Sequence, residues 1–307
     1  MMPKREGLTV REFMTAALGL IPGSINTSKL QVGEATIEIS FGPGGFELPR
    51  ESLIAWVTKA AKAVVAYYGV FPVPVTRLRV NSSARGKGVS GGTTWGNNPP
   101  LTRIFVGRHT TSRQLEDDWM MTHEFVHLAF PDVAEEHHWI EEGIATYVEP
   151  IARSQIGDLA PERIWAEMLH NMSKGEPEPF DEGLDHTHTW GRTYWGGALF
   201  CLVADVRIRQ ATNNHKGLQD ALRAIRNAGG TIDKDWTVER AFKTGDQATQ
   251  MNVLTQLYAE MKDRPVYVDL KTLWHELGVG SSGDVISLND TAPLAQIRRS
   301  ITFARGN

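Results

Sequence analysis

The hydrophobic positions of this chain follow one pattern before residue 130 and another after it. In the first stretch, apolar and polar residues alternate over short segments rich in β-branched residues, which predicts strands. The strand-like segments are 36–41, 73–80 and 102–106, and a helical period over residues 51–68 separates the first two. We therefore predict that this stretch folds as helices around a small twisted sheet.

After residue 130 the apolar spacing is almost entirely helical, and little of the sequence is typical of strands. The segments with this period are 140–156, 160–172, 194–212, 217–228, 250–262, 270–277 and 293–302. The longest predicted loop, residues 174–189, is rich in Pro, Gly and acidic residues, and it could cover a site or run over the surface. The predicted fold class is α+β, with residues 1–130 as an α/β subdomain, residues 131–307 as a helical subdomain, and a cleft between them.

Composition limits the classes of protein to which the chain can belong. With 307 residues, of which 41% are hydrophobic and 22% charged, the chain can bury a sizeable core. The net charge is −4, and the sequence has no cluster of basic residues interleaved with aromatic ones. Both features argue against nucleic acid as a partner. Cys201 is the only cysteine, so an internal disulfide is excluded. No stretch approaches the length of a membrane span.

The N-terminal residues leave the compartment open. Lys4 and Arg5 precede an apolar run at residues 13–21, but Glu6 and Glu12 interrupt the pattern and no convincing cleavage site follows. We expect an ordinary first helix here rather than a signal peptide. The protein is then cytoplasmic, or exported with its signal removed, and the sequence leaves the oligomeric state open as well.

The strongest chemical signal is the run HEFVH, which contains His123, Glu124 and His127. Helical positions i and i+4 lie one above the other, so both imidazoles can reach one ion while the glutamate projects toward a metal-bound water. A capping box at residues 111–114 predicts where the helix begins, and a later proline ends it. Both histidines are therefore expected in the middle of one helix.

A second helical segment, residues 139–149, can supply a third metal ligand. Catalytic zinc takes three protein ligands and keeps a fourth position for water, and a carboxylate from a neighbouring helix commonly completes a pair of histidines. Glu142 is the predicted ligand, because Glu141 lies about 100° around the helix and cannot point at the same ion. The predicted cofactor is one Zn²⁺ ion.

These motifs resemble the gluzincin zinc metallopeptidases, in particular their aminopeptidase N and glycyl aminopeptidase branches. The pairing of HEFVH with WIEEGIATYVE carries the resemblance, which implies a thermolysin-like zincin domain with Glu142 as a zinc ligand and Glu124 as the general base. A third block, TYWGGAL, resembles the family segment whose tyrosine donates a hydrogen bond to the tetrahedral intermediate. The resemblance covers residues 37–225 and gives that role to Tyr194.

The stretch before the HEFVH run, residues 91–97, departs from the family pattern. The aminopeptidases that this chain resembles carry a glutamate there, which anchors the free amino group of the substrate, whereas here the sequence is GGTTWGN. Strict aminopeptidase activity therefore loses its usual anchor, and internal cleavage or atypical exopeptidase activity is comparably supported. A peptide could still pair with the backbone of this strand. The candidate substrate contacts are Gly92, Thr93, Thr94, Trp95 and, from the stretch upstream of Tyr194, His188.

Metal ligands also need partners that orient them. The sequence offers four acidic candidates that it cannot rank, namely Asp117, Asp118, Glu141 and Glu149. Among the remaining histidines, weaker candidates for the cleft than His188 are His137, His138 and His186. No role is predicted for His109, His170, His215 and His275.

The predicted function is hydrolysis of peptide bonds in a peptide or protein substrate. Glu124 would take a proton from zinc-bound water and deliver it to the leaving amine, and Tyr194 would stabilise the oxyanion. Two alternatives stay open: a zinc hydrolase of a non-peptide amide or ester, and a peptide-binding pseudoenzyme without turnover. The presence of base, ligands and tyrosine together speaks against the pseudoenzyme.

Overall fold

A five-stranded mixed sheet is formed by the first part of the chain, in the order β1-β2-β3-β5-β4. The computed structural model describes residues 26–84, 86–283 and 285–303, so the helix expected within residues 4–21 lies outside the described residues. The strands are β1 (Asn26–Val32), β2 (Ala35–Phe41), β3 (Val75–Ser83), β4 (Val89–Trp95) and β5 (Leu101–Gly107). The central strands β2, β3 and β5 are parallel, and both edge strands are antiparallel to their neighbours.

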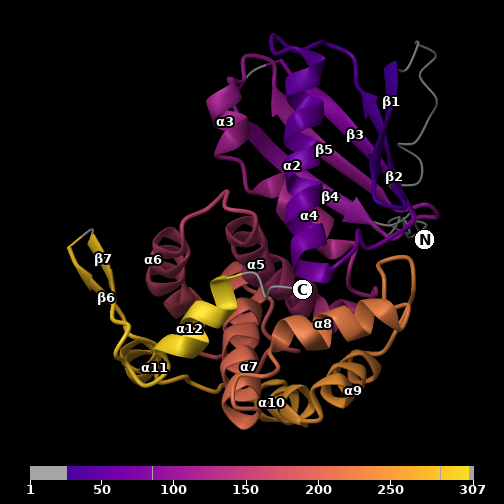
Figure 1. The fold of residues 1–307 in the computed structure, drawn as a ribbon. Coiled ribbons are helices and arrows are strands. Elements are labelled where there is room, and N and C mark those ends of the chain that lie inside the picture. Colours follow the sequence, from indigo (N-terminus) through magenta and orange to yellow (C-terminus); the bar gives the residue numbers. More distant parts are fainter. Residues whose placement is uncertain (1–25, 85, 284, 304–307) are drawn as a thin grey trace, which may run out of the picture.

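One face of this sheet is covered by helices. In β3, Thr76, Leu78 and Val80 are buried and the residues between them are exposed, as the alternation of side chains in a strand requires. Helix α2 (Arg50–Tyr68) lies on the covered face (Figure 1) and adds nine buried residues to the core. The predicted pattern of strand, helix and strand in this region is confirmed.

The helix that carries the HEFVH run is shorter than predicted. The capping box is present, but it opens only the short helix α3 (Ser112–Glu116), and α4 (Met120–His127) begins after a break. The carboxylate of Asp118 stabilises this new start by accepting hydrogen bonds, 3.2 and 3.1 Å long, from the first two backbone amides of α4. His127 is therefore the last residue of α4, and the prediction of one continuous helix with both histidines in its middle was wrong.

Helices dominate the rest of the described chain. They are α5 (His138–Gln155), α6 (Pro161–Asn171), α7 (Gly197–Ala211), α8 (Leu218–Asn227), α9 (Val238–Thr249), α10 (Val253–Met261), α11 (Leu270–Leu277) and α12 (Ala295–Thr302). The sequence did not predict α9, because small residues such as Ala241 and Gly245 on its buried face carry little hydrophobic signal. It also did not predict the hairpin of β6 (Val279–Ser282) and β7 (Val285–Leu288), whose four-residue strands are too short to show alternation.

Helices α5 and α7 cross at a pair of glycines. A Cβ atom added to either Gly143 or Gly197 would lie less than 3.0 Å from the backbone of the other helix, so neither position has room for a side chain. Gly143 follows Glu142 directly, and Gly197 comes three residues after Tyr194. This crossing therefore fixes two segments that carry predicted site residues.

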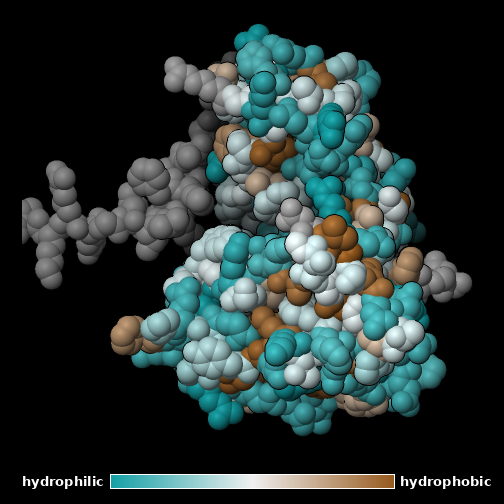
Figure 2. Space-filling view, turned by 90° about the vertical axis from the view of Figure 1, so that its left-hand side faces the viewer, coloured by the Kyte–Doolittle hydropathy of each residue, from teal (hydrophilic) through white to brown (hydrophobic). Residues whose placement is uncertain are grey.

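The elements separate into two regions of the molecule. Figure 1 shows the sheet with α2 in the upper region, helices α5 to α12 in the lower region, and α4 at the level where they meet. In Figure 2, on the face nearest the β6–β7 hairpin, hydrophilic residues cover most of the upper region, and hydrophobic residues gather mainly over the lower one. These elements confirm the α+β class. Within the described segments, none of the helices combines the length and apolar character needed to cross a bilayer.

Candidate active site

The structure brings His123, His127 and Glu142 together. Their ligand atoms all lie within 4.8 Å of one another. Oε2 of Glu142 lies 3.1 Å from Nε2 of His123 and 3.6 Å from Nε2 of His127. Two ligands of a tetrahedral zinc ion, each about 2.0–2.2 Å from the metal, are roughly 3.3–3.6 Å apart. Both the nitrogen and oxygen donors and their spacing thus fit zinc.

The protonation of these groups also suits a cation. Burial favours the neutral form of Glu142, but the imidazoles of His123 and His127 outweigh it and hold the pKa of this carboxyl at about 2. Burial lowers the pKa of His127 to about 4. At neutral pH the carboxylate is charged and the His127 ring is neutral, so both present lone pairs to an ion.

Glu124 points from α4 toward the edge strand β4. The hydroxyl of Thr94 donates a hydrogen bond of 2.7 Å to its Oε2. A Cβ atom at Gly92 would meet the Glu124 carboxyl at less than 3.0 Å, so glycine leaves the space that this side chain fills. Burial raises the pKa of Glu124 to about 7, and the Thr94 hydrogen bond offsets part of that rise.

The other predicted substrate contacts lie elsewhere. Thr93 and Trp95 alternate with Gly92 and Thr94 along β4, so they occupy the opposite face of the sheet. There the Arg103 guanidinium lies 5.0 Å from the centre of the Trp95 ring. His188 is exposed in the loop that precedes Tyr194. Only Gly92 and Thr94 of the five candidates contact Glu124 among the described interactions.

Tyr194 approaches the site from the lower region of the molecule. It lies in a π-helical turn (Gly191–Gly196) that opens α7, and its ring is stacked against that of His123 with 6.4 Å between centres. Burial, together with the negative charges of Glu142 and Glu124, raises the pKa of Tyr194 to about 12. The hydroxyl therefore stays protonated at neutral pH and can donate a hydrogen bond.

The loop at residues 174–189 is held firmly beside this turn. Arg192 and Asp181 form a buried ion pair of 2.7 Å, and the same guanidinium donates to the carbonyl of Gly175. Further along the loop, Asp185 accepts hydrogen bonds from Trp139 of α5 and Tyr258 of α10, at 2.8 and 2.7 Å. The loop thus connects three helical elements instead of running freely over the surface.

The four acidic candidates for orienting partners have different surroundings. Asp118 caps α4 and also accepts a hydrogen bond from the indole of Trp56 at 2.9 Å. Glu149 is buried and pairs with Arg153 at 3.0 Å, whereas Asp117 is exposed. Glu149 also lies near enough to the ligand His123 for their charges to interact, whereas Glu141 reaches the ligands through the histidine described next.

Sequence reasoning gave too little weight to His138. Its Nδ1 lies 2.9 Å from Oε2 of Glu141, and its Nε2 lies 3.5 Å from Oε1 of Glu142. The hydrogen bond to Glu141 is the main reason why the pKa of His138 is raised. One oxygen of Glu142 therefore faces the two ligand histidines and the other faces His138. The signal was present in the sequence, since His138 precedes Glu142 by one helical turn.

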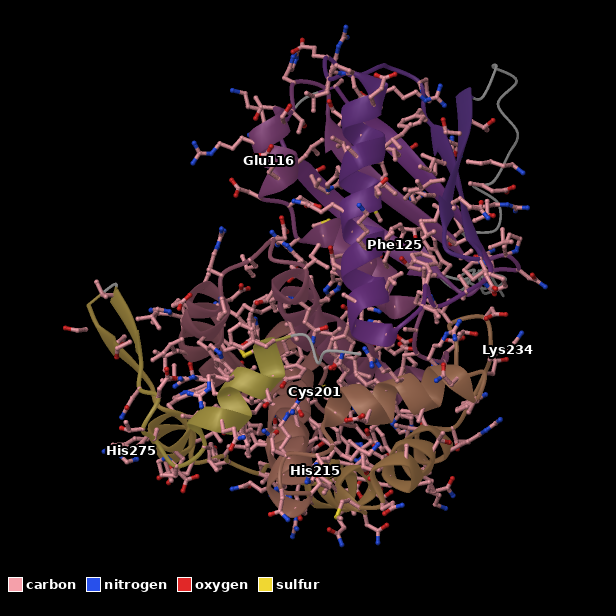
Figure 3. All side chains as sticks on the ribbon, in the orientation of Figure 1. Glu116, Phe125, Cys201, His215, Lys234 and His275 are labelled. Carbon is pink, nitrogen blue, oxygen red and sulfur yellow. The ribbon has the colours of Figure 1, made fainter. Side chains whose placement is uncertain are left out.

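The histidines without a predicted role lie away from this cluster. Figure 3 shows His215 and His275 at the lower end of the molecule, well below Phe125 of α4. His109 pairs with Glu47 at 2.6 Å, and His170 contacts a carbonyl of its own helix. Cys201 is buried in α7.

No protein-family model and no curated protein sequence matches this chain. Among solved structures, the fold is similar to that of an aminopeptidase N family protein from Idiomarina loihiensis, with a TM-score of 0.61 and 13% identity, over 84% of this chain and 50% of that one. It is also similar to an M1 zinc metallopeptidase from Deinococcus radiodurans, with a TM-score of 0.50 and 15% identity, over 79% and 52% of the two chains.

The likeness to these proteins establishes a gluzincin-like fold. The chain spans about half the length of each of these two proteins. Sequence identities of 13% and 15% are too low to assign an activity to it. Because one fold can host many functions, the activity has to be argued from the site itself.

Proposed function

We propose that this chain is a zinc metallopeptidase that holds one Zn²⁺ through His123, His127 and Glu142. The convergence of three ligand atoms within 4.8 Å, on a gluzincin-like fold, carries the proposal. When bound, zinc supplies a Lewis acid that lowers the pKa of a water molecule and polarises a carbonyl group. The donor set of two imidazoles and one carboxylate is typical of catalytic zinc sites.

Glu124 acts as the general base in this proposal. Its carboxyl is next to the ligand His123 in sequence, buried, and oriented by the Thr94 hydroxyl. A pKa of about 7 is close to the value at which a base works best near neutral pH. The carboxylate accepts a proton from the attacking water and then delivers it to the leaving amine.

Tyr194 stabilises the oxyanion in this proposal. Its protonated hydroxyl lies on a ring that stacks against His123, and it can donate to the oxygen that becomes negative when the carbonyl is attacked. The rigid π-helical turn and the crossing at Gly143 and Gly197 hold this donor in place before substrate binds.

A peptide substrate can pair with the free edge of β4. This strand is the last of the sheet, and its Gly92 and Thr94 already contact the base, so a peptide added to the edge passes beside Glu124. No acidic side chain lies on the strand to bind a free amino group. We propose a thermolysin-like cleft between residues 1–130 and 131–307, open to internal cleavage or to atypical exopeptidase action.

The experiment that tests the proposal combines zinc content with cleavage of a mixed peptide library, half of it with blocked amino termini. The wild type is compared with Glu124→Gln and with Glu116→Gln, an exposed glutamate of α3 that serves as the matched control. We expect near-stoichiometric zinc in all three proteins, with cleavage lost only in Glu124→Gln.

Each outcome of this experiment has a separate meaning. Cleavage of blocked peptides would indicate internal cutting, and cleavage of free amino termini alone would indicate an exopeptidase. Zinc without cleavage of any peptide would overturn the peptidase assignment and favour a non-peptide substrate or a silent domain. A protein without zinc would overturn the metal site.

A further inference from the structure

Two exposed tryptophans flank the candidate site. The chain has nine tryptophans, all within the described residues. Seven of them are buried or half-buried, but Trp119 is 49% exposed and Trp190 is 61% exposed. Large exposed aromatic surface is uncommon in a folded protein and often marks a place where a ligand binds.

Both exposed indoles contact residues of the proposed catalytic site. Trp119 meets His123 edge to face, with ring centres 5.4 Å apart, and Trp190 stacks on Tyr194 at 5.9 Å. In each pair the tryptophan precedes its partner by four residues, which places both side chains on one face of a helical turn. Because Tyr194 also stacks against His123, the four rings form one row, with the tryptophans at its two ends.

The two tryptophans come from opposite regions of the molecule and are held by different anchors. Trp119 is the residue immediately before α4, next to Asp118, which caps that helix. Trp190 immediately precedes the π-helical turn, where the buried pair of Arg192 and Asp181 fixes the backbone. Both indoles are therefore presented on rigid supports, so little conformational entropy is lost when a ligand covers them.

We infer that Trp119 and Trp190 determine specificity by binding bulky apolar or aromatic side chains of the substrate close to the cleaved bond. The inference rests on the proposed function, which places the cleaved bond at the metal site. The two tryptophans would also provide substrate contacts in place of the acidic side chain that β4 lacks. The Lys174 ammonium, 5.8 Å from the centre of the Trp190 ring, disfavours a cationic side chain at that end.

The test uses matched peptides that carry Phe, Leu, Ala, Asp or Lys next to the cleaved bond. Trp119→Ala and Trp190→Ala are compared with wild type and with Tyr267→Ala, which removes a side chain that is 70% exposed outside the proposed site. Covering one indole face contributes about 10- to 100-fold in affinity, so each tryptophan variant should lose about that factor in kcat/KM on Phe and Leu peptides, mainly through KM. Ala peptides should change less than threefold, and zinc content should not change.

A second measurement separates this inference from the proposed function. Binding of the same peptides to zinc-loaded Glu124→Gln protein is measured by calorimetry, with and without each tryptophan substitution. Preferential binding of Phe and Leu peptides that is lost on Trp→Ala and partly kept on Trp→Phe supports the inference even where no peptide is cleaved. Equal affinity for all five peptides, or an unchanged preference in both Trp→Ala variants, would overturn it.

Discussion

Tyr194 allows the catalytic proposal to be tested at a single atom. Tyr194→Phe removes the hydroxyl and keeps the ring that stacks on His123. Loss of one oxyanion donor typically costs about a hundred- to a thousandfold in rate, so kcat should fall by that factor. Zinc content and thermal stability should stay at wild-type values. A kcat within threefold of wild type would show that this hydroxyl does not act on the transition state.

His138 should influence the metal without binding it. It lies between the carboxylates of Glu141 and Glu142, so it fixes the oxygen of Glu142 that does not face the ligand histidines. Loss of such an outer partner typically weakens metal binding about 10- to 100-fold. We expect His138→Ala to weaken zinc binding by this factor, in competition with a chelator of known affinity. The Co²⁺ absorption spectrum of the substituted protein should also change.

Two comparisons make the His138 result interpretable. His186→Ala is the matched control, since this histidine is exposed and pairs only with Asp263 among the described contacts. Glu141→Gln should move zinc affinity in the same direction as His138→Ala, because Glu141 holds the ring. Equal zinc affinity in His138→Ala and His186→Ala would mean that the contact to Glu142 has no effect on the metal.

The sequence predicted those site residues that helical spacing brings together. The four-residue spacing selected His123 and His127, and Glu142 was selected because zinc needs a third ligand and Glu141 points another way around the helix. The four-residue spacing could also have selected His138, which precedes Glu142 by one turn. The hydrogen bond between Thr94 and Glu124 could not be predicted from helical spacing, because it depends on the register of β4 and on how the sheet packs against α4.

At the scale of the element, the crossing of α5 and α7 predicts a strong effect of a small change. Gly143→Ala would place a methyl group less than 3.0 Å from the backbone of α7, and the two helices would have to separate. Overpacking of this kind typically costs about 1–3 kcal/mol. Gly91→Ala is the control, because a Cβ atom there meets only Phe105, at 4.0 Å. Urea unfolding should show a loss of stability in Gly143→Ala that Gly91→Ala does not share.

The boundaries of elements were harder to predict than their existence. The break between α3 and α4 depends on Asp118, whose carboxylate caps α4 and also accepts a hydrogen bond from Trp56 on α2. That second contact joins residues 62 positions apart, and no local pattern reveals it. Long helices with a broad apolar stripe, such as α2 and α5, were predicted to within a few residues because their signal is repeated over several turns.

At the scale of the whole molecule, His127 should make the metal-free protein sensitive to acid. Burial lowers its pKa to about 4, whereas an unfolded histidine titrates near 6.5. Between these values the unfolded chain binds more protons than the folded one, so the free energy of unfolding falls as the pH falls from 6.5 to 4. The loss from this residue is at most about 3 kcal/mol.

A comparison of wild type with His127→Gln isolates this contribution. Burial raises the pKa values of Glu124 and Glu149 to about 7 in the folded protein, which favours folding as the pH falls over the same range. Those contributions are common to both proteins. Urea unfolding in the presence of a chelator, at pH 7 and pH 5, should therefore show a larger loss of stability in wild type. Equal losses would contradict the predicted burial of a neutral His127.

Zinc should also stabilise the whole molecule, because its proposed ligands join α4, at the border of the sheet region, to α5 of the helical region. A ligand that binds only the folded state at a hundred times its Kd adds about 2.7 kcal/mol. For a chain of this size that corresponds to a rise in Tm of roughly 4 °C. Adding zinc to the chelated protein should produce this rise in wild type and none in Glu142→Ala. An equal rise in both proteins would mean that zinc stabilises the fold from another site, and the bridge between α4 and α5 would lose its support.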